Sequence, residues 1–297
     1  MPKRTICIQN PASLSIKNSS LAIYMDGELR GLIPLEDIWV VIVETHQAQV
    51  TTAALSKLVD SGIGVMFCGN DHMPNGLLLP LGAHSRHAEI VDDQLAISKP
   101  LQKRLWQNIV KCKIRNQAKV LDLLGFDGSN LRTIEREVLS GDSNNRESVA
   151  ASAYFKLLVP DGGRRSSAIT AALDYGYTVL RAGVGRTAVS GGWLVSRGIH
   201  HSNNLNAFNL VDDLIEPFRP VVDLLVMQSG FTADLDSNDK RKLAAIFEYL
   251  VETPQGRMSV QSAIELELYS LKTAVKARDS TLLQLPEVMP LTKPVLE

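Results

Sequence analysis

The chain has few cysteines and no long apolar run. Its three cysteines are odd in number and far apart in the sequence, which argues against both a disulfide framework and a zinc knuckle. We therefore expect Cys7, Cys68 and Cys112 to be buried free thiols in a protein of the reducing cytoplasm. No stretch approaches the roughly 18 uncharged apolar residues that span a membrane, and residues 1–10 lack the apolar core of a secretory signal. These absences predict a cytoplasmic protein with no membrane partner.

The composition excludes the disordered and fibrous classes. Hydrophobic residues make up 45% and charged residues 21% of the 297 residues, which are ordinary fractions for a globular protein. We find no internal repeat and no low-complexity tract. A globular chain of this length has room for about two domains.

Acidic residues are missing from one long window, although the net charge of the whole chain is only −1. Between Asp93 and Asp122 there is no aspartate or glutamate. The basic residues in this window are Lys99, Lys103, Arg104, Lys111, Lys113, Arg115 and Lys119. A local basic face is what a DNA-binding protein needs to displace phosphate counterions. A solvated helix face explains the same pattern and stays open at this point.

The first ninety or so residues predict mostly β-structure. Residues 20–34 alternate around Asp26-Gly27, a strong residue pair for a tight hairpin. Residues 38–43 form a short continuous apolar run, which is typical of a strand covered on both faces. Residues 51–60 instead have helical apolar spacing after a threonine cap. A small sheet with one helix is therefore expected.

From about Ser98 the pattern becomes helical. Amphipathic segments, separated by Gly, Ser, Asn and Pro clusters, are predicted at residues 101–124, 131–139, 147–158, 166–189, 205–216, 239–251 and 259–277. The tail after Ser280 carries three prolines and is predicted to be extended. The predicted fold class is α+β with two domains: a small β-rich N-terminal domain (1–90), a linker that could itself be helical (91–100), a larger all-α domain (101–280) and an extended tail (281–297).

Three polar clusters in the helical part could carry chemistry. The first runs from Asn144 to Glu147, where an asparagine followed three residues later by a glutamate is close to the pattern of a capping box. Glu147 is then either a capping residue or a carboxylate presented at the first turn of a helix. The small residues Ala150 and Ala151 would let another helix approach closely.

The second cluster places His200 and His201 in a polar stretch between two predicted helices. Neutral imidazole is a good metal ligand and a good proton carrier. Because neighbouring residues usually point apart, one histidine would bind an ion and the other would support it or remain solvated. A pair of solvated loop histidines is the open alternative.

The third cluster contains Asp212, Asp213 and Glu216, followed by Pro217 and Arg219. On a helix Asp212 and Glu216 share a face, whereas Asp213 turns away. Proline should end or kink the helix here, and carboxylates near a helix C-terminus are repelled by its dipole. We therefore expect Arg219 or a bound cation to compensate their charge, and an acidic helix end paired only with Arg219 stays open.

Together the clusters suggest an ion site of one histidine and two carboxylates, which suits Mg²⁺ or Mn²⁺ better than structural zinc. A continuous helix would hold His201 and Glu216 about 22 Å apart. The site therefore requires the chain to fold back within residues 202–206. Candidates for supporting the ligands are His200, Asp212 and Arg219.

At these same residues the sequence resembles the CRISPR-associated adaptation integrase family. Residues 198–220 resemble its longest motif, residues 147–155 its first catalytic motif, and residues 171–177 its core helix. Asp174 stands where the family usually has asparagine, and it is not among the proposed ligands. Residues 72–80 also resemble the family, so the resemblance covers nearly the whole chain, and its details are most similar to members from type II systems.

The resemblance implies a β-rich N-terminal domain and a helical catalytic domain. It implies a catalytic metal site made by Glu147, His201 and Glu216, with His200 at a variable position of the motif. The implied reaction is transesterification, in which the 3′-hydroxyl of a short DNA fragment attacks a phosphodiester at the edge of a repeat array, and DNA nicking when water attacks instead. The implied partners are double-stranded DNA, a second copy of the chain and a small adaptation protein, joined in a heterohexamer.

Basic residues become candidate DNA contacts on this interpretation, by their charge rather than by motif position. They are Lys103, Arg104, Lys111, Lys113, Arg115, Arg146, Arg164, Arg165 and Arg197. Two other functions stay open. A metal-dependent phosphoesterase with another substrate would share the ion site, whereas a non-catalytic DNA-binding scaffold would tolerate the loss of Glu147, His201 and Glu216.

Overall fold

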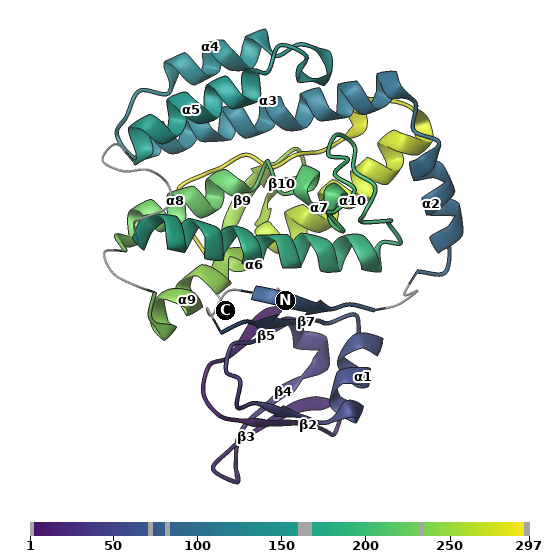
Figure 1. The fold of residues 1–297 in the computed structure, drawn as a ribbon, viewed down its shortest axis with the longest axis vertical. Helices are drawn as coiled ribbons and strands as arrows, with labels where there is room; N and C mark the ends of the chain where they lie inside the picture. Colours follow the sequence, from purple (N-terminus) through teal and green to yellow (C-terminus); the bar gives the residue numbers. More distant parts are fainter. Residues whose placement is uncertain (1–2, 71–73, 81–83, 160–167, 232–234, 294–297) are drawn as a thin grey trace.

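The chain folds as two small sheets packed beneath a thick layer of helices (Figure 1). The computed structural model describes residues 3–70, 74–80, 84–159, 168–231 and 235–293. Within these ranges the N-terminal part is β-rich and the C-terminal part is mainly helical, which confirms the predicted order of the two regions.

The described N-terminal part consists of two four-stranded sheets and one helix. Its elements are β1 (Arg4–Ile8), β2 (Ser13–Lys17), β3 (Ser20–Met25), β4 (Glu28–Pro34), a 3-10 turn (Leu35–Asp37), β5 (Ile38–Val43), β6 (Gln49–Val50), α1 (Thr52–Asp60), β7 (Gly64–Cys68) and β8 (Pro74–Leu78). The strand orders are β1-β5-β7-β8, with only β8 antiparallel, and β4-β3-β2-β6. The predicted hairpin is confirmed, since β3 pairs antiparallel with β4, and Asp26 and Gly27 have φ of 52° and 78°.

Strand β5 is buried along its whole length because it lies between two hydrophobic cores. Ile38 and Val41 belong to a core shared with Leu14 of β2. Trp39 and Ile42 belong instead to the core of the helical part. The prediction of a strand covered on both faces is confirmed, and this sheet joins the two regions into one packed body.

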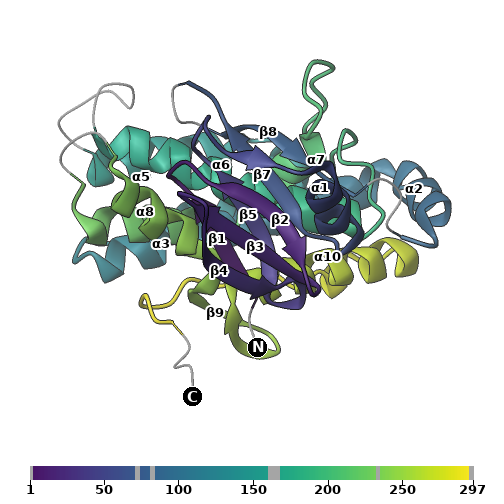
Figure 2. The same cartoon turned by 90° about the horizontal axis from the view of Figure 1, so that it is seen from below.

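The helical part is built around the long helices α3 and α6. Its elements are α2 (His87–Leu95), α3 (Lys99–Leu123), α4 (Ser129–Glu137), a 3-10 turn (Ser140–Asp142), α5 (Arg146–Leu158), α6 (Ala168–Ser190), α7 (Asn209–Leu214), α8 (Arg219–Ser229), α9 (Ser237–Ala244), a 3-10 turn (Ala245–Glu248), β9 (Leu250–Thr253), β10 (Gly256–Ser259), α10 (Val260–Ala277) and a 3-10 turn (Ser280–Leu282). Figure 2, seen from the sheet side, shows α2 and α10 at one end of the helical layer and α8 at the other.

Helix α6 approaches the sheet closely because of a glycine. A Cβ atom at Gly183 would lie 2.7 Å from Trp39 of β5 and would clash with Phe247, so a larger residue would force the helix away from the strand. One turn further along, Arg186 donates from Nε to the carbonyl of Gly62 at 2.7 Å and covers the Trp39 ring at 5.3 Å. The N-terminal sheet therefore fixes the position of α6, which lines the candidate site.

Two predictions about the C-terminal part are wrong. This part is not all-α, because β9 and β10 form an antiparallel hairpin where a helix over residues 239–251 was expected to continue. Strand β9 also pairs with the distant tail through a bridge between Glu252 and Glu287, a contact that no local pattern shows. The helix predicted over residues 205–216 is only the six residues of α7, and it ends before Glu216.

The segment predicted as a linker is mostly helical, and the segment predicted as an extended tail packs on the helical part. Residues 91–100 hold the end of α2 and the beginning of α3. In the tail, Leu283 and Val288 are buried, and the Val288 amide donates to Asn116 Oδ1 of α3 at 3.1 Å. Residues 294–297 lie outside the described residues.

The cysteines and the membrane expectation can be compared directly with the structure. Cys68 and Cys112 are buried, Cys7 is half-buried, and all three are free thiols. Burial raises the pKa of the Cys7 thiol to about 12. Among the described residues, none of the helices combines the length and the apolar character needed to cross a membrane.

Candidate metal and DNA site

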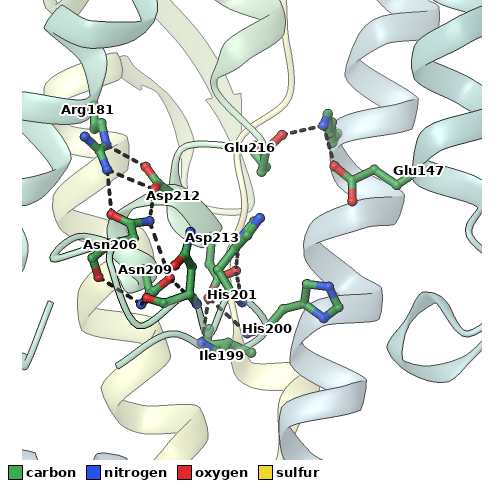
Figure 3. A network of polar contacts seen from close by, with 12 residues as sticks. Glu147, Arg181, Ile199, His200, His201, Asn206, Asn209, Asp212, Asp213 and Glu216 are labelled. Atoms are coloured by element: carbon green, nitrogen blue, oxygen red, sulfur yellow. Dashed lines mark hydrogen bonds and ion pairs between the residues drawn. The ribbon is translucent and has the colours of Figure 1, made fainter. Parts of the chain in front are cut away.

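Two glutamates from different elements meet at one ammonium group. Lys113 of α3 places Nζ 2.6 Å from Glu147 Oε1 and 2.5 Å from Glu216 Oε2. Glu147 lies in the first turn of α5, and Glu216 lies in the turn between α7 and α8. Their side chains point toward each other from opposite sides (Figure 3). The structure therefore brings together two of the three predicted ligands.

The start of α5 places Glu147, but not through the capping box that the sequence suggests. Asn144 bonds to the turn before the helix, accepting from the Leu139 amide. Asp142 takes the capping role, because its carboxylate accepts from the amides of Arg146 at 2.7 Å and Glu147 at 3.1 Å. The Glu147 carboxylate is therefore free of capping and reaches Lys113.

The chain folds back after His201, as a shared site requires. Asn209, at the start of α7, donates from its amide to the carbonyls of Ser196 at 3.0 Å, Asn203 at 2.9 Å and Asn206 at 3.0 Å. Its Oδ1 accepts from the Asn203 amide at 3.1 Å. One buried side chain thus holds both ends of the loop that returns the chain toward Glu216.

Asp213 holds the backbone and the histidine ring of the site in place, although the helical pattern of the sequence predicted that it would point away from the site. It is fully buried, and its carboxylate accepts from the amides of Ile199 at 2.5 Å, His200 at 3.0 Å and His201 at 3.1 Å. It also binds His201 Nδ1 at 2.7 Å. Gly198 makes room for this cradle, because a Cβ there would stand 2.6 Å from Asp213 Oδ2.

This contact orients the His201 ring. Nδ1 faces Asp213, which leaves Nε2 as the ring nitrogen that can bind an ion, and His201 borders the same cavity as Glu216. The Asp213 hydrogen bond, against the opposing effect of burial, raises the pKa of His201, and the charges of Asp213, Glu216 and Asp212 act in the same direction. Sequence reasoning missed Asp213 because it assumed a continuous helix through Glu216.

His200 lies elsewhere. Its ring stacks on Trp106 of α3 at 4.3 Å and 2° between planes, whereas His201 contacts the same tryptophan edge-on at 5.7 Å. Trp106 is buried, and both histidine rings pack against it. The two imidazole planes lie at 83° to each other, so the rings point in different directions. The structure therefore places His201, and not His200, on the wall that contains Glu216.

Glu216 is held ionised despite its burial. Burial by itself would raise its pKa, but Lys113 and Arg219 outweigh that effect and hold the pKa of Glu216 below its usual range. Arg219 Nε lies 3.1 Å from Glu216 Oε1, and the guanidinium stands over the Tyr177 ring at 4.6 Å. The compensation of Glu216 by a cation, as expected from the sequence, is present.

Asp212, a candidate for supporting the ligands, borders the same cavity as Glu216 and pairs with α6. Arg181 of α6 binds it through two hydrogen bonds, from Nε at 2.6 Å and from Nη2 at 2.9 Å. Asn206 donates to the same carboxylate at 2.6 Å and accepts from Arg181 at 3.0 Å. Asp212 therefore fastens the returning loop to α6 (Figure 3).

A polar cavity of about 620 Å³ opens beside these groups. Its walls are Thr170, Asp174, Tyr177, Thr178, Arg181, His201, Asp212, Ile215, Glu216 and Arg219. A second cavity of about 390 Å³ lies on the other side of His201 and includes Lys99, Gln102 and Arg197. His201 thus stands between two hollows that both carry basic side chains, and an extended anionic chain such as DNA could pass it.

Some candidate DNA contacts are exposed basic residues, whereas others form ion pairs with carboxylates of the same chain. Lys103, Arg104 and Arg197 are exposed, and Lys111 is half-buried. Arg115 pairs with Glu135 at 2.6 Å, and Arg146 pairs with Glu137 at 3.2 Å. Lys113 is buried between two carboxylates, so in this structure it does not belong to a surface phosphate track. Arg164 and Arg165 lie outside the described residues.

The structure thus combines a β-rich region with a mainly helical region, whose polar cavity is bordered by Glu216 and by His201, the partner of buried Asp213. The chain matches the family described as CRISPR associated protein Cas1 over residues 6–158 and 163–250. It belongs to this family, the CRISPR-associated endonucleases and integrases of spacer acquisition. The resemblance noted from the sequence motifs is therefore confirmed at the level of the family.

Individual relatives agree with this assignment. The chain is 40% identical, over 299 residues and 98% of each chain, to the CRISPR-associated endonuclease Cas1 of Neisseria meningitidis serogroup C (strain 8013). Its fold is similar to a casposase bound to integration product, with a TM-score of 0.75, 19% identity and coverage of 95% and 93%. It is also similar to part of a Cas6-RT-Cas1–Cas2 complex, with a TM-score of 0.74, 18% identity and coverage of 97% of this chain and 36% of that one.

Endonucleases of this family are typically metal-dependent. The described residues contain no ready cluster of three or more His, Cys, Asp or Glu side chains at ligand spacing. Glu147 and Glu216 nevertheless already share a cation, the Lys113 ammonium, and His201 lines the cavity beside Glu216. Carboxylate oxygens with one imidazole nitrogen form a donor set that suits Mg²⁺ or Mn²⁺, so these residues fit a divalent ion.

Proposed function

We propose that this chain inserts short DNA fragments into a CRISPR array in the cytoplasm, using Mg²⁺ or Mn²⁺ held by Glu147, His201 and Glu216. The observation that carries the proposal is the convergence of two glutamates on one cation next to a histidine oriented by a buried aspartate. These groups come from α3, α5 and the segment around α7, which only the fold brings together.

The proposed reaction exchanges one phosphodiester for another. The 3′-oxygen of the fragment forms a bond to phosphorus, and the bond from phosphorus to the 3′-oxygen of the array strand breaks. The attacking hydroxyl loses its proton, and the departing 3′-oxygen takes up a proton to become a new 3′-hydroxyl. No nucleoside triphosphate is needed, because the number of phosphodiester bonds does not change. With water as the nucleophile the same arrangement would nick DNA. A bound divalent ion would orient the phosphate and stabilise its developing charge.

The side chains of this chain would position the reacting groups. Asp213 holds the His201 ring so that Nε2 faces away from the carboxylate. Arg219 keeps Glu216 ionised and lines the cavity, where its guanidinium could also meet a phosphate oxygen. Lys103, Arg104 and Arg197 are exposed basic residues that could follow the duplex away from the site.

We also propose that the chain works as a homodimer and assembles with a small adaptation protein into a heterohexamer. The similarity to a chain of a Cas6-RT-Cas1–Cas2 complex supports this assembly. The similarity to a casposase bound to integration product supports a DNA substrate. Assignment to a type II system stays a prediction, which the genes next to this one would test.

Strand transfer tests the proposal directly. The purified chain, with and without its small partner, is given labelled DNA fragments and a plasmid that carries a repeat array, in Mg²⁺ or Mn²⁺. Joined product is expected with the unmodified chain and is expected to disappear with EDTA and in Glu147→Gln, His201→Ala and Glu216→Gln. Glu265→Gln, an exposed acid of α10 outside the cavity, is the matched control and should join DNA normally.

Other outcomes would identify other functions. DNA binding without joining or nicking in either metal, with the partner present, would indicate a scaffold. Cleavage without preference for the repeat array would indicate a phosphoesterase with another substrate. Activity that survives all three substitutions would place the reaction outside this site.

A further inference from the structure

The lysine between the two glutamates differs from the other cations at the site. Lys113 is buried, with 11% of its side chain exposed, and its ammonium contacts Glu147 at 2.6 Å and Glu216 at 2.5 Å. Arg219 also pairs with Glu216 but is additionally held over Tyr177. Among the described residues, the Lys113 ammonium makes its ion pairs with these two carboxylates, so its position depends on them and theirs on it.

Within the group of ion-paired side chains at this point, the charges are balanced. Glu147 and Glu216 contribute two negative charges, and Lys113 and Arg219 contribute two positive charges. A divalent ion placed between the carboxylates would leave a surplus of positive charge as long as the ammonium stayed. Charges in a half-buried site repel strongly, because the surroundings screen them less than bulk water does. Metal and ammonium therefore compete for the same electrostatic position.

They also compete for the same oxygen atoms. Glu147 Oε1 and Glu216 Oε2 each lie at contact distance from Nζ, whereas Mg²⁺ needs its ligand oxygens at about 2.0–2.1 Å in a near-octahedral shell. An ion cannot take up this shell while an ammonium occupies the space between the two oxygens. A lysine has a flexible four-carbon stem, so its charged end can move away without a change in the backbone of α3.

We propose that Lys113 is an internal counter-cation that holds Glu147 and Glu216 together before metal binding and is displaced when the divalent ion binds. The inference rests on the proposed function, because it concerns the same ion site. Lys113 is then a positioning residue that preassembles two ligands from separate elements. It also lowers the affinity of the site for the metal, because each binding event must break two ion pairs.

Metal binding measured by calorimetry, with Mn²⁺ and the full chain, tests this role. Lys113→Met removes the charge but keeps the apolar stem, and it should bind Mn²⁺ more tightly by about 10- to 100-fold, the range over which groups next to a metal site alter affinity. Lys113→Arg keeps the charge and is the matched control, which should bind no more tightly than the unmodified chain. Affinity that is unchanged or weaker in Lys113→Met overturns the inference.

If Lys113→Met is too unstable for calorimetric titration, its unfolding temperature with and without Mn²⁺ provides a second test. Without metal, Lys113→Met leaves two carboxylates facing each other and should unfold at a lower temperature than the unmodified chain. Saturating Mn²⁺ should then raise the unfolding temperature more in Lys113→Met than in the unmodified chain. An equal or smaller rise in the variant contradicts the displacement of Lys113 by the metal.

One further variant separates this inference from the proposed function. His201→Ala should abolish tight Mn²⁺ binding in both the unmodified and the Lys113→Met backgrounds. If Mn²⁺ binding depends on His201 but not on Lys113, the ion site stands and the counter-cation role is wrong. If Mn²⁺ binding ignores His201, the proposed ion site itself is wrong, and the role of Lys113 falls with it.

Discussion

At the scale of single residues, Asp213 shows how one buried charge organises a site. Its carboxylate accepts three consecutive backbone amides and the His201 ring, so it fixes both the shape of the loop and the orientation of the imidazole. A carboxylate can stay buried only if its lone pairs are satisfied in this way. The Glu267 carboxyl of α10 is also fully buried, but neither of its oxygens has a hydrogen-bond partner among the described residues.

Asp213→Asn should damage the site while keeping its shape. The NH2 group of the asparagine side chain would face backbone N–H groups that now donate to the Asp213 carboxylate. These buried donors would lose their acceptor, which should destabilise the fold by about 1–3 kcal/mol. The neutral side chain should also lower the pKa of His201, which Asp213 now raises. Chemical denaturation and NMR titration of His201 in the metal-free chain measure the two effects. An unchanged His201 titration would mean that the hydrogen bond does not control the ring.

Glu267 should make the stability of the chain depend on pH. It is fully buried, neither carboxyl oxygen has a hydrogen-bond partner among the described residues, and burial raises its pKa well above the ordinary value. A raised pKa in the folded state means that the folded form retains a proton that the unfolded form loses. Stability is therefore complete below the unfolded pKa and falls as the pH rises toward the folded pKa, by about 1.4 kcal/mol per pH unit from this group.

Glu267→Gln tests that sign. Urea unfolding between pH 5 and pH 8 should show a flatter loss of stability in the variant than in the unmodified chain, because the variant has no proton to lose at this position. Glu265→Gln, an exposed neighbour on the same helix, should keep the original slope. Parallel slopes in all three proteins would show that Glu267 does not remain protonated in the folded chain.

At the scale of elements, the short helix α7 and its returning loop decide which side chains meet. Because α7 ends at Leu214, Glu216 is released to face Lys113 and Asp213 can reach back to His201. The loop is held on one side by Asn209 and on the other by Arg181, which binds both Asp212 and Asn206. Helix α6 thus acts as a fixed support for the loop.

Arg181→Met should loosen this loop without unfolding the chain. Its ion pair is partly solvated, so the cost in global stability should be under about 1 kcal/mol. Hydrogen–deuterium exchange at residues 202–208 should become faster, because the bonds from Arg181 to Asp212 and Asn206 are lost. Arg132→Met is the control and should leave this exchange unchanged, because it breaks a similarly exposed pair with Asp122 that borders neither cavity beside His201.

Gly198→Ala should disturb the cradle by simple overlap. The new methyl group would stand 2.6 Å from Asp213 Oδ2 and would clash with the His201 carbonyl, at a cost of about 1–3 kcal/mol. Gly31→Ala, in β4, is the matched control, because its nearest contact would be a comfortable 3.6 Å from Ile23. Thermal unfolding that gives equal shifts for both variants would contradict the close packing at Gly198.

At the scale of the whole molecule, the C-terminal tail reaches the candidate site through the core. Asn116 of α3 donates to the carbonyls of Pro217 at 2.8 Å and Pro286 at 3.0 Å. The tail therefore contacts the same side chain that supports the residue next to Glu216. Its buried residues, Leu283 and Val288, attach it to the main core.

A chain that ends at Asp279 should be less stable and should bind metal less well. Removing two buried apolar side chains costs about 1.5–3 kcal/mol each by area, and Asn116 would lose two partners, the Pro286 carbonyl and the Val288 amide. Calorimetric unfolding and Mn²⁺ titration measure the two losses. A truncated chain that keeps both properties, but no longer assembles with the small adaptation protein, would instead make the tail a docking segment.

Local patterns in the sequence predicted the features that depend on neighbouring residues. The Asp26-Gly27 hairpin, the buried strand at residues 38–43 and the β-rich then helical order are correct because turn geometry and apolar periodicity are short-range effects. Charge and motif resemblance also singled out Glu147, His201 and Glu216. Glu147 and Glu216 both contact Lys113, and His201 borders the same cavity as Glu216.

Contacts between distant segments were decided only by the tertiary structure. Asp213 binds His201, and β9 pairs with the tail. Lys113, expected at the surface, is buried against Glu216. Each of these contacts joins residues far apart in the chain. A periodic pattern records which face of an element is apolar, but it does not record which element that face will meet. Burial of an ionised group depends on such a partner, so the final arrangement of charges at this site follows from packing.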